Sequence, residues 1–226
     1  FERYDILGGV FNPDYDENIK FAKQIGVNTD RVYKDFDEFV AIETAKTEDE
    51  RIEVVSVLTP NFLHYPMARK LLENGFNVIC EKPLVSSLKE VDELEKISKA
   101  TGKIIFPVFQ YRYGPGFSKL KALIKSGLAG NPLVASLETH WNRGKDYYSK
   151  PWRGTWEGEQ GGAILSHSIH IHDLVSMILG PVSNVFSKLT TRVNDIEVED
   201  CAALSIEMEN GTLVTSSITL GAANDT

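Results

Sequence analysis

The sequence has 226 residues, of which 42% are hydrophobic and 25% are charged, as is ordinary for a globular protein with a substantial buried core. Its formal net charge of −8 argues against nucleic acid or an anionic membrane as the main partner, because either would normally require a basic face. No apolar run is long enough to span a bilayer, and the two cysteines have no metal-ligand spacing. Two cysteines in a chain of this size fit a reducing cytoplasm better than a disulfide scaffold, so we expect a cytoplasmic protein.

In chain order, the first half alternates short strand-like runs with segments of helical spacing. The run 53–58 (EVVSVL) is continuous and β-branched, which is typical of a strand that is covered on both faces of a parallel sheet. Such alternation predicts a doubly wound parallel α/β sheet. The expected strands are 4–11, 31–33, 53–58, 77–80 and 103–108, and the expected helices are 18–25, 35–45, 64–73 and 88–100.

The second half has a different pattern. Its strand-like runs alternate apolar and polar residues, and Asn210-Gly211 is a hairpin turn signal between the last two. This pattern predicts an α+β domain with a largely antiparallel sheet, so we expect two domains, residues 1–110 and 111–226. The expected helices are 116–126 and 163–179, joined by a Trp- and Gly-rich loop at 142–162, and the expected strands are 133–140, 182–189, 201–208 and 212–220.

Ligands of doubly wound sheets bind at the carboxyl ends of the strands. Two polar segments directly follow expected strands: residues 59–61 (TPN) and residues 81–83 (EKP). Partial burial of Lys82 there would lower the pKa of its ammonium toward the range useful for proton transfer, with Glu81 beside it to steady the charge. The alternative is a surface turn with a solvated ion pair.

Three of the five histidines lie in the segment 161–173 (GGAILSHSIHIHD). On a helix His167 and His170 share a face, because they are three residues apart, and His172 is turned away. A three-histidine metal site is therefore not expected from this segment. A two-histidine site would need a distant third ligand, and we predict no metal. Asp173 follows His170 by three residues and can either orient the ring of His170 or pair locally.

Other candidates lie in the loop before this helix and at the domain junction. Trp152 and Arg153 have the chemistry to stack on a sugar and to bind its hydroxyl or carboxylate groups, but they can equally fix the loop against the core. Trp141 and Trp156 favour the packing role. Arg112, between two tyrosines after the last strand of the first domain, is either a hinge residue or a substrate contact.

Four segments in order, TPNFLH (59–64), CEKPL (80–84), QYRY (110–113) and PWRGTWEGEQGGAILSHSIHIHD (151–173), resemble the glucose–fructose oxidoreductase/inositol dehydrogenase (Gfo/Idh/MocA) family. The resemblance runs from about residue 4 to the end. It implies a Rossmann dinucleotide-binding domain followed by an α+β domain with a mostly antiparallel open sheet. It also implies NAD(P)-dependent oxidation or reduction of a hydroxyl or carbonyl group on a sugar, cyclitol or related polyol.

The resemblance assigns roles to individual residues. It implies that Lys82 and His170 are the catalytic pair. The cofactor side would comprise Asn12, Thr59, Pro60, Asn61, His64, Glu81 and Lys82. Apart from the resemblance, the residue chemistry described above makes Arg112, Trp152, Arg153, His167 and Asp173 our candidates for the substrate side. Where NAD-preferring relatives often have an acid after the second strand this sequence has Asn12, followed by acidic residues and no arginine. We expect NAD, with NADP possible.

The sequence departs from the family pattern at two places. The family's GxGxxG loop precedes the strand that begins here at Tyr4, so we expect that loop, with its strand and helix, and the C-terminal end of the second domain to lie outside this sequence. Ser166 stands where the family has an aspartate four residues before the histidine. A serine carries no charge, and the neighbouring His167 is the polar group that could replace the aspartate.

Three functions are compatible with these residues. The first is a dehydrogenase or reductase acting on CH–OH groups, and the second is a glycosidase or lyase of the same family that uses NAD transiently. The third is a non-catalytic sugar- or NAD-binding regulatory protein, since a fold does not determine a function. In each case the expected partner is a small-molecule sugar or polyol, and family members commonly associate through the sheet, so we expect a homodimer or homotetramer.

Overall fold

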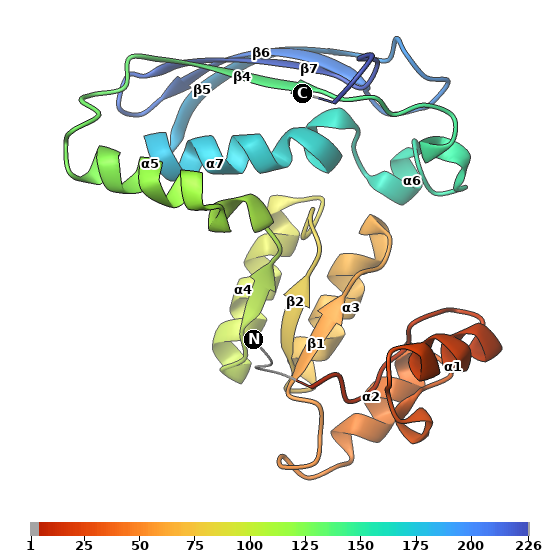
Figure 1. The fold of residues 1–226 in the computed structure, drawn as a ribbon. Helices are drawn as coiled ribbons and strands as arrows, with labels where there is room; N and C mark the ends of the chain where they lie inside the picture. Colours follow the sequence, from red (N-terminus) through yellow and green to blue (C-terminus); the bar gives the residue numbers. More distant parts are fainter. Residues whose placement is uncertain (1–4, 226) are drawn as a thin grey trace. The chain divides into compact units, whose positions relative to one another are not determined.

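The computed structural model describes residues 5–225, which form two compact units (Figure 1). The first unit contains the chain up to Val57, together with Pro66–Cys80 and Val91–Phe106. The second unit contains the segments Leu58–Tyr65 and Glu81–Glu90 and everything from Pro107 onward. The loops that follow the first two strands therefore belong to the second unit.

The first unit is built on a three-stranded sheet with the order β1-β2-β3. β1 and β2 are parallel, in a register that pairs Val54 with Asn77 and Val57 with Cys80. The interior includes Phe76, Leu71 and Leu72, none of which is exposed. The strands are β1 (Val54–Val57), β2 (Asn77–Cys80) and β3 (Ile105–Pro107), and the helices are α1 (Tyr15–Gln24), α2 (Phe36–Thr44), α3 (His64–Glu73) and α4 (Leu88–Thr101).

The first two expected strands are not formed as continuous strands. Tyr4 lies outside the described residues, and the segment after it makes a single parallel bridge between Gly9 and Val32. The bridge consists of two main-chain hydrogen bonds, from Gly9 N to Arg31 O at 3.0 Å and from Tyr33 N to Gly9 O at 3.1 Å. The sequence pattern marks extended residues, but it does not show how many of them pair with a neighbour.

The second unit is a four-stranded sheet with the order β4-β7-β6-β5. The β5–β6 and β6–β7 pairs are antiparallel and the β4–β7 pair is parallel, so the prediction of a largely antiparallel sheet is confirmed. Figure 1 shows α7 lying along one face of this sheet. The strands are β4 (Val134–His140), β5 (Val182–Thr190), β6 (Cys201–Met208) and β7 (Leu213–Thr219), and the helices are α5 (Pro115–Lys125), α6 (Trp156–Glu159) and α7 (Ile169–Leu179).

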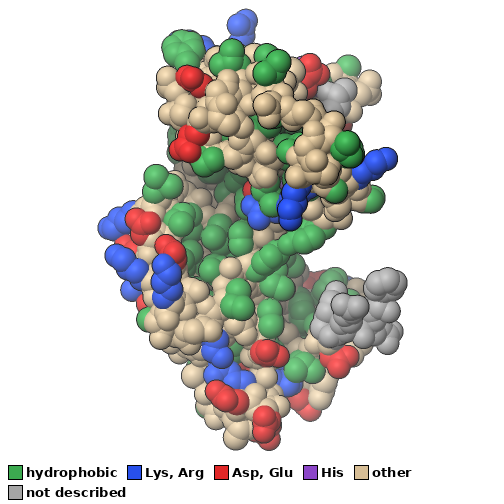
Figure 2. Space-filling view, turned by 90° about the vertical axis from the view of Figure 1, so that its left-hand side faces the viewer, with side chains coloured by type: hydrophobic (Ala, Val, Ile, Leu, Met, Phe, Trp, Pro, Cys, Tyr) green, Lys and Arg blue, Asp and Glu red, His purple; other side chains and the backbone are tan. Residues whose placement is uncertain are grey.

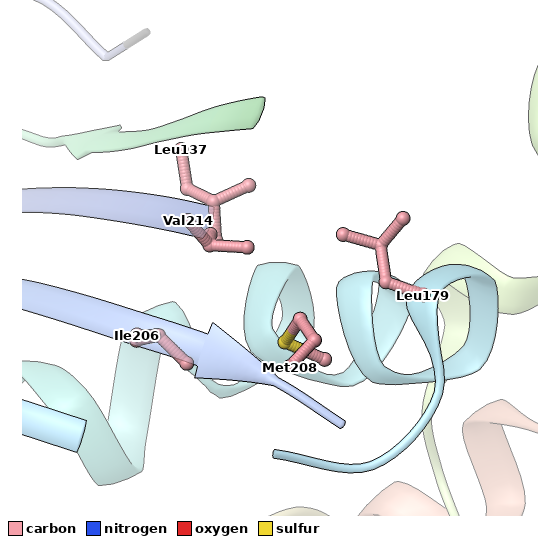
Figure 3. Close-up of a cluster of buried hydrophobic side chains, with 5 residues drawn as sticks. All are labelled: Leu137, Leu179, Ile206, Met208 and Val214. Atoms are coloured by element: carbon pink, nitrogen blue, oxygen red, sulfur yellow. The ribbon is translucent and has the colours of Figure 1, made fainter. Parts of the chain in front are cut away.

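A hydrophobic cluster fixes α7 to this sheet. Figure 3 shows Leu179, at the end of α7, beside side chains from three strands. Burying each of these side chains stabilises the packing by about 1.5–3 kcal/mol. The helix that carries His170 is thereby held in place by its opposite end. The cluster comprises Leu137, Leu179, Ile206, Met208 and Val214.

The predicted helix 163–179 is not a single α-helix. Ile164–Ser168 forms a π-helical turn, and α7 begins after it. The carboxylate of Glu199 accepts hydrogen bonds from the main-chain nitrogens of Gly162 at 3.0 Å and Ile164 at 3.1 Å. A Cβ at Gly162 would lie 1.9 Å from the main-chain oxygen of Glu199, so only glycine permits this approach. π-helical turns are frequent at functional sites.

Charged side chains of both signs are visible on the surface. On the face shown in Figure 2, Lys and Arg side chains are interspersed with Asp and Glu side chains and do not gather into one basic patch. Within residues 5–225, no helix combines the length and the apolar character that crossing a membrane would require.

Candidate active site

Lys82 stands in the turn that directly follows β2, where the Lys82–Pro83 peptide bond is cis. Its ammonium nitrogen donates a hydrogen bond to the main-chain oxygen of Ser166 at 2.6 Å, and its main-chain nitrogen donates to Glu81 Oε2 at 3.1 Å. Burial lowers the pKa of Lys82, an effect that the negative charge of Glu81 partly offsets. The lysine is therefore a half-buried group bonded to the main chain rather than a solvated surface ion.

His170 lies in the first turn of α7 and is 4% exposed. Its ring stacks on Tyr111, with ring centroids 4.7 Å apart, and meets Phe109 edge-on at 6.3 Å. Burial, followed by the nearby charge of Lys82, lowers the pKa of His170. The imidazole is therefore held in the neutral form, which can accept a proton.

His167 lies in the π-helical turn and is also 4% exposed. Its ring lies 5.4 Å from that of Trp141 and 5.5 Å from that of Tyr147, measured between centroids. Burial, aided by the charge of Lys82, lowers the pKa of His167 to about 3. His172 is turned away from both rings, as helix geometry predicts, and its Nε2 lies 3.0 Å from Ser216 Oγ on β7.

Asp173 forms an ion pair with Arg112, in which the guanidinium donates from Nε to Oδ2 at 2.7 Å and from a terminal nitrogen to Oδ1. The sequence left open whether Asp173 orients His170 or pairs with another group, and the structure places it on Arg112. The guanidinium of Arg112 also lies over the ring of Phe109, 4.9 Å from its centroid. This pair joins the segment that carries Tyr111 to the helix that carries His170.

Arg153 is sandwiched between aromatic rings in the loop before the histidines. Its guanidinium lies 3.9 Å from the centroid of Tyr147 and 4.4 Å from that of Trp152, and it forms a salt bridge with Glu159 at 3.2 Å. Glu159 is 2% exposed, and its Oε2 accepts a hydrogen bond from Gly154 N at 2.7 Å. Burial raises the pKa of Glu159, although the bonds from Gly154 and Arg153 oppose that effect.

Sequence reasoning did not single out Glu159. The only signal was its place in the segment 151–173 that carries the family resemblance. Its interactions could not be anticipated, because they depend on how the loop folds around Arg153. Glu159 also contacts the loop after β1, because Asn61 Nδ2 donates a hydrogen bond to its main-chain oxygen at 2.8 Å.

The loop after β1 contains Thr59, Pro60, Asn61 and His64. The ring of His64 is 1% exposed, with Nδ1 2.6 Å from the main-chain oxygen of Pro83 and Nε2 2.8 Å from that of Thr59. Asn12 belongs to the first unit, where its Oδ1 accepts a hydrogen bond from Asp14 N at 2.9 Å. The structure thus brings the loop after β1 together with the turn at Lys82. Asn12 is not part of this group of residues.

Unsatisfied polar atoms concentrate at this site. Among residues 5–225, four buried side-chain polar atoms have no hydrogen-bond partner, and three of them are Thr59 Oγ1, His167 Nδ1 and His170 Nδ1. Buried polar groups nearly always have partners, so such a concentration fits a site that a polar ligand completes. The same part of the chain contains no group of three or more His, Cys, Asp or Glu residues placed to hold a metal ion.

A parallel α/β unit followed by an α+β unit with a mostly antiparallel sheet defines a class of two-domain proteins, and the family within that class follows from comparison. Residues 4–109 match the family described as oxidoreductase family, NAD-binding Rossmann fold. Residues 117–226 match the GFO/IDH/MocA C-terminal domain. The chain belongs to the Gfo/Idh/MocA family of oxidoreductases, and the family predicted from its four sequence segments is confirmed.

Individual relatives resemble most of the chain. The uncharacterized oxidoreductase YfiI of Bacillus subtilis is 29% identical over 96% of this chain and 58% of its own length. The scyllo-inositol 2-dehydrogenase (NADP(+)) IolW of the same species is 24% identical over 90% of this chain and 58% of its own length. The structure of the WlbA dehydrogenase from Chromobacterium violaceum, in complex with NADH and UDP-GlcNAcA, is 27% identical with a TM-score of 0.86, covering 97% of this chain and 61% of that one.

The chain spans about three-fifths of the length of each of these three proteins, which is 58% of the first two and 61% of the third.

Proposed function

We propose that the protein to which this chain belongs is an NAD(P)-dependent oxidoreductase. It transfers hydride between a nicotinamide cofactor and a hydroxyl or carbonyl group of a sugar, cyclitol or related polyol. The observation that carries the proposal is the hydrogen bond that joins Lys82 to the π-helical turn before α7. The Lys82 ammonium reaches the main-chain oxygen of Ser166, and burial lowers the pKa values of both Lys82 and His170. Such pKa shifts suit two groups that exchange a proton with a substrate hydroxyl.

Residues of this chain would accept the proton of the substrate hydroxyl and donate it in the reverse direction. In the oxidative direction the substrate hydroxyl lies between Lys82 and His170, and one of these groups accepts its proton. The low pKa of His170 keeps its imidazole neutral and ready to accept, and the lowered pKa of Lys82 makes its neutral amine more accessible. When bound, the nicotinamide supplies the hydride acceptor.

The residues after β1 and β2 fit the cofactor side. Thr59, Pro60, Asn61 and Glu81 follow parallel strands directly, and the buried hydroxyl oxygen of Thr59 has no protein partner. We propose Asn12, for its own part, as a hydrogen-bond partner of a ribose hydroxyl. The acidic run after Asn12 and the absence of arginine from it favour NAD. Comparing kcat/KM for NAD and NADP tests this preference, and a higher value with NADP would reverse it.

His167, Trp152, Arg153, Arg112 and Asp173 would form the substrate side. Both guanidinium groups are already paired with carboxylates. The two arginines would therefore shape the wall of the substrate site, while His167 would form hydrogen bonds with the substrate. Exposed hydrophobic side chains on β5, such as Phe186 at 77%, support a homodimer or homotetramer formed through the sheet. A molar mass from light scattering tests the oligomer. The expected cytoplasmic location is also a proposal, which cell fractionation tests.

The proposal is tested by mixing the full-length protein with NAD or NADP and a panel of polyols and sugars, and following reduced cofactor. Formation of NADH or NADPH with at least one polyol is the expected result. Release of a leaving sugar without net reduced cofactor would instead indicate the glycosidase or lyase chemistry. Ligand and cofactor binding by calorimetry without turnover of any polyol would indicate a regulatory protein.

A further inference from the structure

Each ring nitrogen of His64 faces a main-chain oxygen. Nδ1 lies 2.6 Å from Pro83 O, and Nε2 lies 2.8 Å from Thr59 O. A carbonyl oxygen only accepts, so a contact is a hydrogen bond only where the ring nitrogen carries a hydrogen. Either neutral tautomer has one such nitrogen, and the imidazolium has two. The residue is 1% exposed, and water therefore does not replace these partners. His64 thus ties together the two loops that follow β1 and β2.

One of these contacts bears directly on Lys82, because Pro83 is the next residue. The contact of the Lys82 ammonium with Ser166 O fixes only the end of a long side chain. The bond from the Lys82 main-chain nitrogen is to the adjacent Glu81, so it stays within the turn. The contact from His64 to Pro83 O connects the main chain of the turn to another segment.

The other contact of His64 leads to α6. It fixes Thr59, and two residues later Asn61 donates to the main-chain oxygen of Glu159 at 2.8 Å. Glu159 in turn holds Arg153. These contacts link the two loops and α6 around Lys82, and the ring of His64 lies where the two loops meet.

We propose that His64 is a positioning residue that holds the Glu81–Pro83 turn, and with it the ammonium of Lys82, against the main-chain oxygen of Ser166. The importance of this placement for catalysis rests on the function proposed above for Lys82. This role differs from the cofactor contact that the family resemblance implies for His64, because both ring nitrogens face oxygens of the protein. A group displaced by about 1 Å can lose on the order of a hundredfold in rate.

The test measures the pKa of Lys82 directly, so it does not depend on knowing the substrate. In the full-length protein with carbon-13-labelled lysine, the Lys82 ε-carbon signal is the one absent from Lys82→Arg. His64→Phe keeps a ring of similar size and removes both nitrogens. Because burial lowers the pKa of Lys82, release of the turn into water is expected to raise that pKa toward the ordinary lysine value.

His172→Phe is the matched control. It removes a histidine hydrogen bond in the same unit, to Ser216, without touching either loop. The pKa of Lys82 is expected to stay at its wild-type value in this variant. A rise in the control equal to that in His64→Phe would show that any loss of a buried histidine loosens the site, and would overturn the proposal.

His64→Gln is the second variant, in case circular dichroism shows that His64→Phe does not fold. Its amide can still donate to one of the two carbonyls, so the expected rise in the Lys82 pKa is smaller and has the same sign. An unchanged Lys82 pKa in the folded His64 variants overturns the positioning role. A raised Lys82 pKa in a protein that turns over no polyol supports the positioning role and contradicts only the proposed function.

Discussion

The ammonium nitrogen of Lys82 lies 2.6 Å from the main-chain oxygen of Ser166, a residue 84 positions later in the chain. Ser166 occupies the position where the family resemblance expects an aspartate. The contact uses a main-chain atom, so it does not require a carboxylate at this position. Lys82 is therefore joined to the histidine segment in a way that the side chain at 166 does not determine.

Ser166→Ala should accordingly leave the contact between Lys82 and the main-chain oxygen of residue 166 intact. The serine hydroxyl makes one long hydrogen bond, to Gly161 O at 3.3 Å, so its loss should lower the free energy of unfolding by less than about 1.5 kcal/mol. We expect kcat to change by less than about threefold. Steady-state kinetics and urea unfolding check both values. A large fall in kcat with unchanged stability would show that the hydroxyl takes part in proton transfer.

His167 predicts a specific acid sensitivity. Its pKa is lowered from 6.5 to about 3 by burial and then by Lys82, so on acidification the unfolded chain binds the proton first. The contribution of His167 to the free energy of unfolding is complete above about pH 6.5 and decreases as the pH falls toward 3. The slope is at most about 1.4 kcal/mol per pH unit.

Urea unfolding at a series of pH values, for the wild type and His167→Phe, measures this contribution. The variant should lose stability less steeply than the wild type between pH 6.5 and pH 4. Equal slopes in the two proteins would mean that His167 titrates in the folded state as it does in the unfolded chain.

The Arg112–Asp173 pair should stabilise the join between the Tyr111 segment and α7. The side chain of Asp173 is 12% exposed and that of Arg112 is 34% exposed, so solvent screens the pair in part. Asp173→Asn should lower the free energy of unfolding by about 1–3 kcal/mol, because it leaves a half-buried guanidinium without its carboxylate. In a double-mutant cycle with Arg112→Met, an interaction free energy near zero would contradict the pairing.

Glu159→Gln should lower the pKa of Lys82. Burial and the positive charge of Arg153 lower the pKa of Lys82, whereas the negative charges of Glu81 and Glu159 raise it. Neutralising Glu159 leaves only Glu81 to oppose the lowering. The ε-carbon titration described for His64 measures this change, and the two substitutions should move the pKa in opposite directions. A rise in the Glu159→Gln variant would indicate that Glu159 acts through the structure of its loop and not through its charge.

Much of the fold follows from local sequence patterns. The predicted helix 64–73 and the predicted strands 77–80 and 201–208 have the bounds found in the structure, because apolar periodicity and turn residues are properties of neighbouring residues. The π-helical turn could not be predicted in this way. It is stabilised by Glu199, which follows Gly162 by 37 residues, and no local pattern reports such a contact.

In the candidate site, too, the sequence identified some features and not others. The family resemblance directed attention to Lys82, His170 and the loop after β1. It did not show that the ring of His64 lies between two main-chain oxygens, or that Arg153 is already held by Glu159 and two rings. These features depend on which backbone atoms meet in three dimensions, and side-chain identity alone does not determine that.

The most direct test of the central claim is the turnover of Lys82→Met in the full-length protein, with a polyol that the wild type oxidises. Lys70→Met is the control, since Lys70 pairs with Asp37 on the surface of the first unit at 2.6 Å. Lys82→Met should lower kcat by about 100- to 10,000-fold while leaving the dissociation constant of the cofactor nearly unchanged, and Lys70→Met should retain wild-type turnover. Wild-type turnover by Lys82→Met would contradict the assignment of Lys82 to the proton transfer.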